Sequence, residues 1–533
     1  MKRIVTGSLA KRADGFAINE LGIPSLKLMD RAAASVARYV MALAEEEGLK
    51  KDCEIAVFAG AGNNGADGVL CAVKLLSEGF LNTEVYFCGK PEKRSEEFVI
   101  QLDKLRALGR EIRDYDSFQL SEKRPSIVID ALFGIGLKRE VKGAYAECIE
   151  LMNRIKDEAG AYIVSVDVPS GLNSDDGQNM CPRPADADIT VTFGYGKTGF
   201  YLNYGYGNCG EIFVEDIGYP KDILSKLALT EGELLFLMEE GDLKKRGLGE
   251  RDPRANKSDY GKAVLAAGSK GMAGAAFLSG LAAFKTGAGM VKYLGPEENR
   301  TILQMLIPEA MYDAFTSEES EAELFDKVKE SIVWAGRRGC VVLGPGLGTG
   351  EQSKKLVRTV VSALSEHNKR EPGSTVFLVA DGDALNVISG ERELLKDLGG
   401  FTVITPHVGE MSRLTGKTIG EIKADPVGTA VKFFNDTGIN IILKDYVSVV
   451  IETNREIFIN TSGNAALAKA GSGDVFTGIL AALIMRNGGL KDSLSEAAYI
   501  HGRAGVKASE IMGLNGTLAR DIALSLPSVI ESF

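Results

Sequence analysis

Residues 53–89, CEIAVFAGAGNNGADGVLCAVKLLSEGFLNTEVYFCG, contain the order of elements that decides the fold. The runs CEIAVFAG and TEVYFCG are nearly continuous in apolar and β-branched residues, as expected of strands that are covered on both faces. The stretch Gly68–Glu78 between them is helical in character. A strand, a helix and a strand in this order predict a mainly parallel sheet with helices on its faces.

The alternation of strands and helices continues outward from this stretch and breaks once. Four further strand-like runs follow in the first half: SIVIDALFG, YIVSVDVPSG, DITVTFGYG and GEIFVEDIG. The charge-rich segment 225–260 lacks a strand pattern, and a new α/β series begins after it, with uncharged helices predicted over 271–284 and 473–485. We therefore predict two α/β domains, residues 1–225 and 226–533, with a short helix crossing the junction.

The composition excludes several classes of protein and partner. The 62 basic and 73 acidic residues give a net charge of −11, and without a basic block this argues against nucleic acid or membranes as the main partner. The chain shows no signal peptide and no stretch of about 18 apolar residues, and its seven cysteines form no CxxC pair, so we expect a reduced, cytoplasmic protein. Glycine accounts for 62 of the 533 residues, well above its usual share of about 7%. This excess indicates that glycine is used at turns or at sites.

A glycine-rich loop follows the first strand of the opening stretch. Gly60, Gly62 and Gly65 match the spacing of a dinucleotide-binding loop, in which glycines let the backbone approach phosphate at a helix N-terminus. An ordinary Rossmann dehydrogenase also needs an acid at the end of its second strand. That strand ends in VYFCGK, and its only nearby acid, Glu84, lies at its start. A dehydrogenase is therefore disfavoured, and a glycine-rich turn without a ligand stays as the simpler alternative.

Three strand ends of the first half carry polar oxygen groups beside glycines. The loop 63–67 supplies amides and a carboxylate, Asp130 ends a second strand, and Asp167 ends a third before the turn Pro169–Gly171. Open α/β sheets bind ligands at the carboxyl ends of their strands, and amide and carboxylate oxygens suit hard cations. A single acid at a strand end is often only a helix cap, but three together favour a site.

The strongest signal in the second half is GNAALAKAGSGDVFTGILAAL, residues 463–483. Its glycines Gly471 and Gly473 open a long uncharged helix, whose N-terminus favours negative charge. Asp474 places a carboxylate at this anion hole, where it could remove a proton from a hydroxyl while the amides stabilise the charge that develops. The alternative is an ordinary acidic residue in the first turn of a helix.

These motifs resemble two enzyme families. GAGNNGADG, DALFGIG and VDVPSGLNSDDG resemble the NAD(P)H-hydrate epimerases over most of residues 10–220. LAAGSKGMAGAAFLSGLAAFKTGAGMV, VLGPGLG, VADGDAL, ITPHVGEMSRLTG, LKDYVSVV and the GSGD signature resemble, in order and spacing, the NAD(P)H-hydrate dehydratases of the ribokinase-like superfamily over about 255–510. The whole chain thus resembles the bifunctional NAD(P)H-hydrate repair enzymes, which implies an N-terminal Rossmann-like three-layer αβα sandwich and a C-terminal ribokinase-like αβα domain.

The resemblance also implies site residues in the epimerase half. The hydrated nucleotide would contact Asn63, Asn64, Gly65, Ala66, Asp67, Gly134, Ile135, Gly136, Leu137, Lys138, Arg139, Glu140 and Asp167. Asp167 would act at the reacting ring, and a potassium ion would be held by Asn64, Asp130 and Ser170. Ala66 departs from the usual glycine of this loop, which is a small change if its φ is negative and a backbone shift if φ is positive.

In the dehydratase half the resemblance implies two further groups of residues. Gly274, Ala275, Gly346, His407 and the catalytic base Asp474 would line the hydrated nucleotide. Lys444, Asp445, Tyr446, Val447, Ser448 and Gly473 would bind ADP or ATP, although the family more often has LKGxxT where Asp445 and Ser448 stand. His407 alone would more simply be a packing residue or helix cap, and His367 and His501 are expected at the surface or in the core.

The activity implied is the repair of reduced nicotinamide nucleotides hydrated at the C5–C6 double bond. The first half would interconvert the R and S hydrates with K⁺, and the second would dehydrate the S form with Mg²⁺ and ADP or ATP, giving AMP or ADP and phosphate. The bacterial-style fusion order favours ADP. The expected partners are small-molecule nucleotides, together with copies of the same chain in a homo-oligomer.

Two rival functions stay open from the sequence. The second half could be a ribokinase-like kinase for a vitamin or sugar hydroxyl, with the first half as a nucleotide-binding accessory. The first half could also be a non-catalytic scaffold or ligand sensor. Product analysis separates a kinase, which releases a stable phosphorylated product, from a dehydratase, which releases phosphate and reduced nicotinamide.

Overall fold

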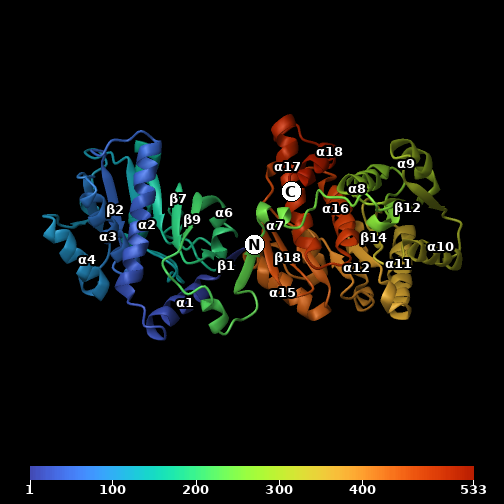
Figure 1. The fold of residues 1–533 in the computed structure, drawn as a ribbon, viewed down its shortest axis with the longest axis horizontal. Coiled ribbons are helices and arrows are strands. Elements are labelled where there is room, and N and C mark those ends of the chain that lie inside the picture. The colour runs from blue at the N-terminus through green and yellow to red at the C-terminus, as the bar shows by residue number, and fades with distance from the viewer. The chain divides into compact units, whose positions relative to one another are not determined.

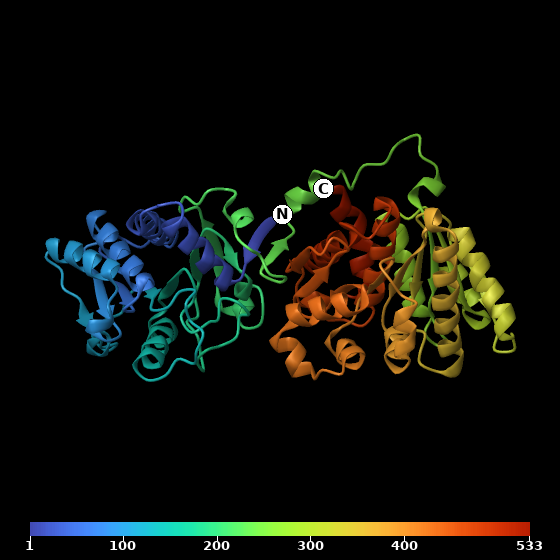
Figure 2. The same cartoon turned by 90° about the horizontal axis from the view of Figure 1, so that it is seen from below.

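The computed structural model describes residues 1–533, and the chain divides into two compact units. The N-terminal unit comprises residues 3–235, and the C-terminal unit comprises residues 236–533 with residues 1–2. In each unit helices cover both faces of a largely parallel sheet (Figures 1 and 2). This arrangement confirms the predicted α/β fold class.

The N-terminal unit is built on seven parallel strands in the order β4-β3-β2-β5-β6-β7-β9. These strands are β2 (Ile55–Ala59), β3 (Thr83–Phe87), β4 (Arg113–Asp114), β5 (Ile127–Ala131), β6 (Tyr162–Val166), β7 (Ile189–Phe193) and β9 (Glu211–Glu215). A short parallel pair, β1 (Lys2–Val5) with β8 (Gly196–Lys197), lies outside this sheet. The strand order reverses between β2 and β5, which is the point where open α/β sheets bind ligands.

Helices cover both faces of this sheet because its strands are apolar on both faces. In β2, Val57 packs into one hydrophobic cluster with α2 and α3, while Phe58 packs into another with α5 on the opposite face. The helices are α1 (Gly7–Asn19), α2 (Ser25–Glu46), α3 (Asn63–Ser77), α4 (Glu96–Ala107), α5 (Ala144–Ala159) and the short α6 (Gly205–Asn208). The result is the expected three-layer sandwich.

The C-terminal unit repeats the same principle with a longer sheet. Its strands are β10 (Leu234–Leu237), β11 (Lys262–Ala266), β12 (Met290–Pro296), β13 (Met311–Phe315), β14 (Cys340–Leu343), β15 (Phe377–Ala380), β16 (Thr402–Ile404), β17 (Asn440–Leu443), β18 (Ser448–Ile451) and β19 (Ile457–Asn460). The order β13-β12-β11-β14-β15-β16-β17 is parallel, and β18 and β19 extend it as antiparallel strands. Here the order reverses between β11 and β14.

The helices of the C-terminal unit include the two long apolar helices predicted from the sequence. The set is α7 (Glu240–Lys244), α8 (Ala273–Thr286), α9 (Arg300–Leu306), α10 (Glu321–Ala335), α11 (Glu351–Arg370), α12 (Asp383–Gly390), α13 (Val408–Thr415), α14 (Ile419–Ala424), α15 (Pro426–Thr437), α16 (Ser472–Asn487), α17 (Ser493–Met512) and α18 (Ala519–Glu531). Gly478 of α16 allows the two predicted helices to pack closely, because a Cβ there would lie 2.1 Å from the Ser279 carbonyl oxygen of α8.

Two details of the chain are not apparent from the sequence pattern. The run NIILKDYVSVVIE folds as a hairpin, in which β17 and β18 pair antiparallel around residues 444–447. The segment 225–260 does contain a strand, β10, which pairs in parallel with β19 through Phe236 and Leu237. The four residues of β10 are too few for an alternating pattern to stand out among charged neighbours. The short helix predicted for this segment is present as α7.

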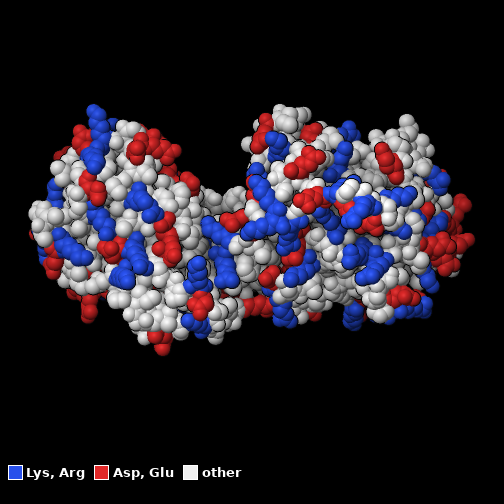
Figure 3. Space-filling model, in the orientation of Figure 1, with Lys and Arg blue, Asp and Glu red and all other residues white.

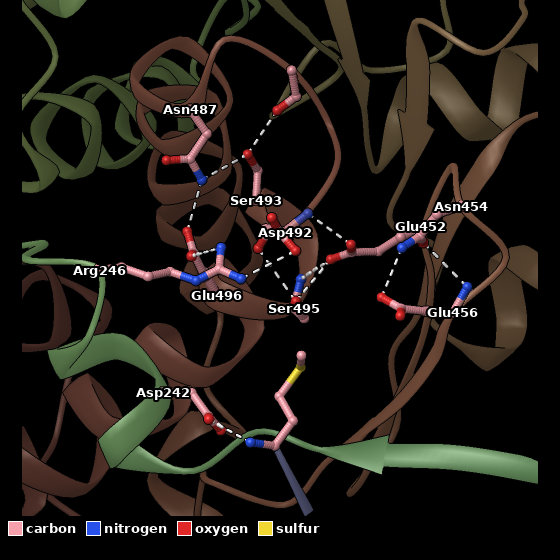
Figure 4. A network of polar contacts seen from close by, with 12 residues as sticks. Asp242, Arg246, Glu452, Asn454, Glu456, Asn487, Asp492, Ser493, Ser495 and Glu496 are labelled. Atoms are coloured by element: carbon pink, nitrogen blue, oxygen red, sulfur yellow. Dashed lines mark hydrogen bonds and ion pairs between the residues drawn. The ribbon is translucent and has the colours of Figure 1, made fainter. Parts of the chain in front are cut away.

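The charged part of the junction is fixed to the C-terminal unit by a polar network around the start of α17 (Figure 4). Arg246 forms ion pairs with Glu496 at 2.6 Å and Asp492 at 3.1 Å. Glu452, at the end of β18, accepts hydrogen bonds from the backbone N–H groups of Asp492 and Ser495 and so caps α17 from a distant strand. This network explains why a charge-rich segment is ordered against the core.

Charged side chains of both signs are interspersed on the face of each unit that Figure 3 shows. Among the helices, none combines the length and the apolar character that crossing a membrane requires.

Candidate functional site

A cavity of about 740 Å³ opens in the N-terminal unit at the carboxyl ends of β2, β5 and β6. Its walls come from the loops that follow these strands and from α1, α2 and the segment 193–219. Ten of the predicted epimerase-site residues line it: Asn63, Asn64, Asp67, Gly134, Ile135, Gly136, Leu137, Lys138, Arg139 and Asp167. The cavity therefore lies at the switch point of the sheet and unites motifs that are far apart in the sequence, from Asn63 to Asp167.

Asp167 is the most constrained residue of this cavity. It follows β6 with a φ of +64°, a left-handed conformation that Asp adopts more readily than most residues. Its Oδ1 accepts hydrogen bonds from the Lys197 ammonium at 2.8 Å and from the Thr192 hydroxyl at 3.0 Å. Lys197 is buried and donates also to Thr192 and to the Phe193 carbonyl oxygen. The ion pair and the Thr192 hydrogen bond hold the Asp167 carboxylate in one orientation.

Lys197 was not predicted as a site residue. It lies in β8, in a stretch whose sequence shows only the end of a strand, and its contact with Asp167 arises from the tertiary fold. The one sequence signal available was a lysine directly after the uncharged run ITVTFGYG, residues 189–196.

The glycine-rich loop approaches its neighbours as closely as the motif suggested. A Cβ at Gly65 would lie 1.8 Å from the Gly60 carbonyl oxygen, so only glycine fits there. A Cβ at Gly134 would lie 3.0 Å from Asp167 Oδ2 and 3.2 Å from Asn64 Oδ1, so these two side chains border one small space. Ala66 lies inside α3 with a negative φ, so its replacement of the usual glycine requires no shift of the backbone.

Three predicted residues do not line the cavity. Gly65 and Ala66 are buried behind the loop, where they shape it rather than face a ligand. Glu140 is exposed and pairs with Lys142 at 2.7 Å. The loop after β5 thus contributes its first residues to the wall and turns away after Arg139.

Two further carboxyl groups face the cavity. Burial and the charges of Asp167 and Asp14 raise the pKa of Asp67 well above its usual range, and the Oδ1 of Asp67 has no hydrogen-bond partner. Asp14, on α1, was not predicted as a site residue. Burial raises its pKa and the charge of Asp167 adds to the rise, while a 3.0 Å hydrogen bond from the Tyr219 hydroxyl opposes it.

The predicted potassium ligands are oxygen groups around a buried carboxylate. Asp130 is fully buried, and its carboxylate accepts hydrogen bonds from the Ser165 hydroxyl and from the Ser170 hydroxyl and N–H. Its partners are hydroxyl and backbone N–H groups and not basic side chains, and burial raises its pKa. The amide oxygen of Asn64, the atom of that side chain that could bind a cation, borders the same small space beside Gly134 as Asp167 Oδ2. Hard oxygen groups around an uncompensated carboxylate fit a cation such as K⁺.

The second site lies at the N-terminus of α16 in the C-terminal unit. Gly471 has a φ of +90°, and no side chain caps the helix, so its first amides have no side-chain acceptor. Burial, together with the charges of Asp381 and Asp383, raises the pKa of Asp474 to about 7. A carboxyl group with this pKa can exchange protons near neutral pH, which a general base requires.

Lys444 and Asp381 meet in front of this helix end. Lys444 Nζ donates to Asp381 Oδ1 at 2.7 Å, and the Thr405 hydroxyl donates to the same oxygen at 2.7 Å. A Cβ at Gly473 would lie 3.5 Å from both Asp381 Oδ2 and Lys444 Nζ. The predicted residues Lys444, Gly473 and Asp474 are thus brought together, and Asp381, quoted in the VADGDAL motif without a role, lies among them.

His407 caps α13, which was the simpler of its two interpretations. Its Nδ1 accepts hydrogen bonds from the N–H groups of Gly409 and Glu410, which leaves the proton on Nε2. Burial and the charges of Lys444 and Arg413 lower the pKa of His407. The half-exposed ring is therefore neutral, and its Nε2–H lies 3.5 Å from Glu410 Oε1. Because capping uses only Nδ1, the Nε2–H donor can also serve a ligand.

Three of the remaining predicted residues lie together at the start of α8. A Cβ at Gly346 would come within 2.7 Å of the Ala275 Cβ, and Gly274, which precedes Ala275, faces open space. The same loop is linked to Asp474 through Asp383, whose carboxylate accepts the Gly348 N–H at 2.7 Å. Asp383 was not predicted as a site residue.

The segment 445–448, predicted to bind ADP or ATP, is less uniform than the resemblance implied. Asp445 pairs with Lys423 at 3.4 Å, Tyr446 is half exposed, and Val447 is buried in the hairpin. Ser448 begins β18 and pairs with Asn460 of β19. Of this hairpin, only Lys444 points toward the N-terminus of α16, where it contacts Asp381. Asp445 and Ser448, which depart from the LKGxxT pattern, lie outside that contact.

His501 was expected to be a plain surface or core residue, but it contacts the signature loop. Its Nε2 lies 3.1 Å from the hydroxyl of Ser472, and its ring packs on Phe476 at 5.1 Å between centroids. Burial and the nearby Lys444 lower its pKa to about 4, so the ring is neutral.

The chemistry of this site fits Mg²⁺ only together with a ligand. Asp381, Asp383 and Asp474 give it three carboxylates against one ammonium, that of Lys444. No group of three His, Cys, Asp or Glu side chains is close enough to form a metal cage. Mg²⁺ usually binds through one or two carboxylates plus substrate phosphates, so this arrangement suits a metal that arrives with a nucleotide.

Comparisons with known proteins identify the family. Residues 25–199 match the family model of the YjeF-related protein N-terminus, and residues 263–528 match that of NAD(P)H-hydrate dehydratase. Among solved structures, the ADP/ATP-dependent NAD(P)H-hydrate dehydratase from Bacillus subtilis, co-crystallised with ATP/Mg²⁺, is 25% identical and covers 55% of this chain and 97% of its own, with a TM-score of 0.45.

The relatives extend over the whole chain. The bifunctional NAD(P)H-hydrate repair enzyme Nnr of Thermofilum pendens is 31% identical over 99% of this chain and 96% of the relative. The enzyme of the same name from Moorella thermoacetica is 31% identical over 99% of this chain and 97% of the relative. The resemblance seen in the sequence motifs is thereby confirmed, and the chain belongs to the family of bifunctional NAD(P)H-hydrate repair enzymes.

Proposed function

We propose that the N-terminal unit interconverts the R and S hydrates of NAD(P)H and that the C-terminal unit dehydrates the S hydrate with ADP or ATP. The observation that carries the proposal is the presence of two separate carboxylate sites in one chain. Asp167 lines a nucleotide-sized cavity in the first unit, and Asp474 lies at an uncapped helix N-terminus in the second. Hydration yields both epimers, so one chain with both activities completes the repair.

In the C-terminal unit, hydroxide is a poor leaving group and phosphate a good one. Asp474 takes the proton of the C6 hydroxyl, whose oxygen bonds to the terminal phosphorus of the nucleotide as the bond from that phosphorus to the bridging oxygen breaks and AMP or ADP leaves. The C6–O bond then breaks as the electron pair of the ring nitrogen expels phosphate, and loss of a proton from C5 to water restores the double bond. The amides at Gly473 and the ammonium of Lys444 face the transferring group, and Mg²⁺ when bound would neutralise phosphate charge.

The partners and the co-substrate follow from the same proposal. ADP is the favoured phosphoryl donor because the two activities are fused in the bacterial order. The neutral Nε2–H of His407 and the open face at Gly274 are suited to the hydrated nucleotide. The expected homo-oligomer stays a prediction, which light scattering of the purified chain would check.

The products distinguish this function from that of a ribokinase-like kinase. The chain is incubated with the S hydrate of NADH, Mg²⁺ and ADP or ATP, and phosphate and reduced nicotinamide are measured together. We expect one phosphate for each reduced nicotinamide formed. A stable phosphorylated hydrate, with no phosphate released, would mean that the second half is a kinase.

We predict that dehydration weakens in acid because its base becomes protonated. The pKa of Asp474 is about 7, so kcat/KM for the S hydrate should fall roughly tenfold per pH unit below neutrality and level off above it. Glu410 also has a pKa raised to about 7 by burial, so the matched control is Glu410→Gln, which should keep the same acid limb. An acid limb that disappears in Glu410→Gln would assign the titration to Glu410 instead.

We predict that K⁺ stabilises the N-terminal unit, a readout that does not depend on activity. At a K⁺ concentration of about 100 times Kd, binding adds about 2.7 kcal/mol to the free energy of unfolding, whereas equal Na⁺ adds little. Thermal unfolding of the full chain in KCl and NaCl measures the difference. Asn64→Ala removes one amide ligand at the cavity wall and should reduce it, and equal midpoints in both salts for the unchanged protein contradict a K⁺ site.

A further inference from the structure

The epimerase cavity contains a carboxyl group whose placement matches the needs of an inversion. Asp14 lies on α1, where Ala10, Asp14 and Ile18 recur every four residues and form one stripe along the cavity wall. Asp167 belongs to a different wall, at the end of β6. Two carboxyl groups from separate elements therefore face the same space.

The two carboxyl groups have opposite electrostatic surroundings. Asp167 pairs with the buried ammonium of Lys197, which stabilises its charged form. Asp14 forms no ion pair, and its one hydrogen-bond partner is the neutral hydroxyl of Tyr219, which donates to Oδ1 at 3.0 Å. Burial and the negative charge of Asp167 raise the pKa of Asp14. Such a difference in surroundings separates an acid from a base within one site.

Tyr219 fixes the position of Asp14. Its ring packs closely against Gly194, where a Cβ would lie 2.5 Å from Tyr219 Cε2, and it stacks with Tyr195 at 6.5 Å between centroids. The Tyr219 hydroxyl donates to Oδ1 of Asp14, and no side-chain hydrogen bond engages Oδ2, which leaves that oxygen available to a ligand in the cavity that Asp14 lines.

We propose that Asp14 is a second catalytic residue of the epimerase, acting as a general acid on one face of the nicotinamide ring while Asp167 acts as a general base on the other. This inference rests on the proposed epimerase function. Inversion at C6 requires a hydroxyl to leave from one face and water to add to the other, and carboxyl groups on two walls of the cavity reach both faces.

The reaction balances without any further reactant. Asp14 gives its proton to the C6 hydroxyl, the C6–O bond breaks, and water leaves while the lone pair of the ring nitrogen forms an iminium bond. A second water adds to the opposite face of C6, its proton passes to Asp167, and the electron pair returns to nitrogen. One proton has moved from Asp14 to Asp167, and exchange with solvent restores the starting state. The reverse conversion uses the same two groups with their roles exchanged.

The test begins with Asp14→Asn, which keeps the shape of the side chain and an acceptor for Tyr219. The pure R hydrate of NADH is incubated with the full chain without ADP or ATP, and the S form is separated by chromatography. We expect kcat to fall about 100-fold or more, with KM changed by less than about threefold. Dehydration of the S form and the unfolding midpoint should be retained, which shows that the variant folds.

Matched variants distinguish Asp14 from its neighbours. Asp103→Asn, at the exposed surface of α4, should leave epimerisation unchanged. If Asp14→Asn keeps kcat within about threefold of the unchanged protein, or if Asp67→Asn loses activity while Asp14→Asn does not, Asp14 is not the acid. If the unchanged protein itself does not convert R to S, the proposed epimerase function fails, independently of Asp14.

The fate of oxygen tests the bond that breaks. Epimerisation in H₂¹⁸O should place one solvent oxygen on C6 for each inversion, above the uncatalysed exchange of the hydrate alone. Inversion with the original oxygen retained would mean that the ring opens at the C6–N bond, and it would overturn the roles given to Asp14 and Asp167.

Discussion

Asp474→Asn should lower kcat for dehydration of the S hydrate by about 10²–10⁴-fold, the usual contribution of a general base. The amide keeps the size of the carboxyl group, so the uncapped amides of α16 and the neighbouring Lys444 stay in place. What the variant loses is a group that can accept the proton of the C6 hydroxyl. KM should change little, because the base acts mainly in the transition state.

The control for this variant is Asp326→Asn, an exposed residue of α10 in the same unit. Interconversion of R and S hydrates should be unchanged in both variants, since that activity is proposed for the other unit. Intact dehydration in Asp474→Asn would refute the assignment of the base, whatever the effect of the control.

Asp167→Asn should abolish interconversion of the hydrates and leave dehydration of the S form intact. Asparagine is preferred to alanine here because it tolerates the φ of +64°, whereas Cβ strain in a left-handed residue costs about 1–2 kcal/mol. Replacing Asp167 by either asparagine or alanine leaves the ammonium of Lys197 buried without its counter-charge. Such a loss lowers the free energy of unfolding by about 3–5 kcal/mol. Loss of epimerisation could then reflect unfolding of the N-terminal unit.

A double variant separates chemistry from stability. Asp167→Asn with Lys197→Met removes both charges and should recover much of the lost stability, as replacing a buried ion pair by apolar groups often does. We expect the unfolding midpoint to recover and epimerisation to stay absent. Epimerisation that returns with the midpoint would show that Asp167 has only a structural role.

The sequence predicted the parts of both candidate sites that lie directly after a strand or at the start of a helix. Asp167 follows β6, and residues 63–67 begin α3 shortly after β2; the structure joins them at one cavity. Asp474 was found in the same way, because two glycines before a long apolar helix mark an anion hole. These signals are local, so no knowledge of distant contacts was required.

The residues that were missed are those whose position depends on long-range packing. Asp14 reaches the cavity from the first helix, and the hydroxyl that holds it belongs to Tyr219, more than 200 residues later. Lys197 is an ordinary lysine in sequence and becomes a buried counter-charge only through the fold. Conversely, Glu140 was included by its motif, although the loop turns it toward solvent.

The most direct test of the account uses the full chain with an equal mixture of R and S hydrates of NADH, Mg²⁺ and excess ADP or ATP. The absorbance of reduced nicotinamide is followed to completion. We predict that all of the hydrate is converted, because the N-terminal unit supplies S hydrate as the C-terminal unit consumes it. Conversion that slows at half of the hydrate, to the rate of spontaneous epimerisation, would contradict the epimerase, and the absence of reduced nicotinamide would contradict the dehydratase.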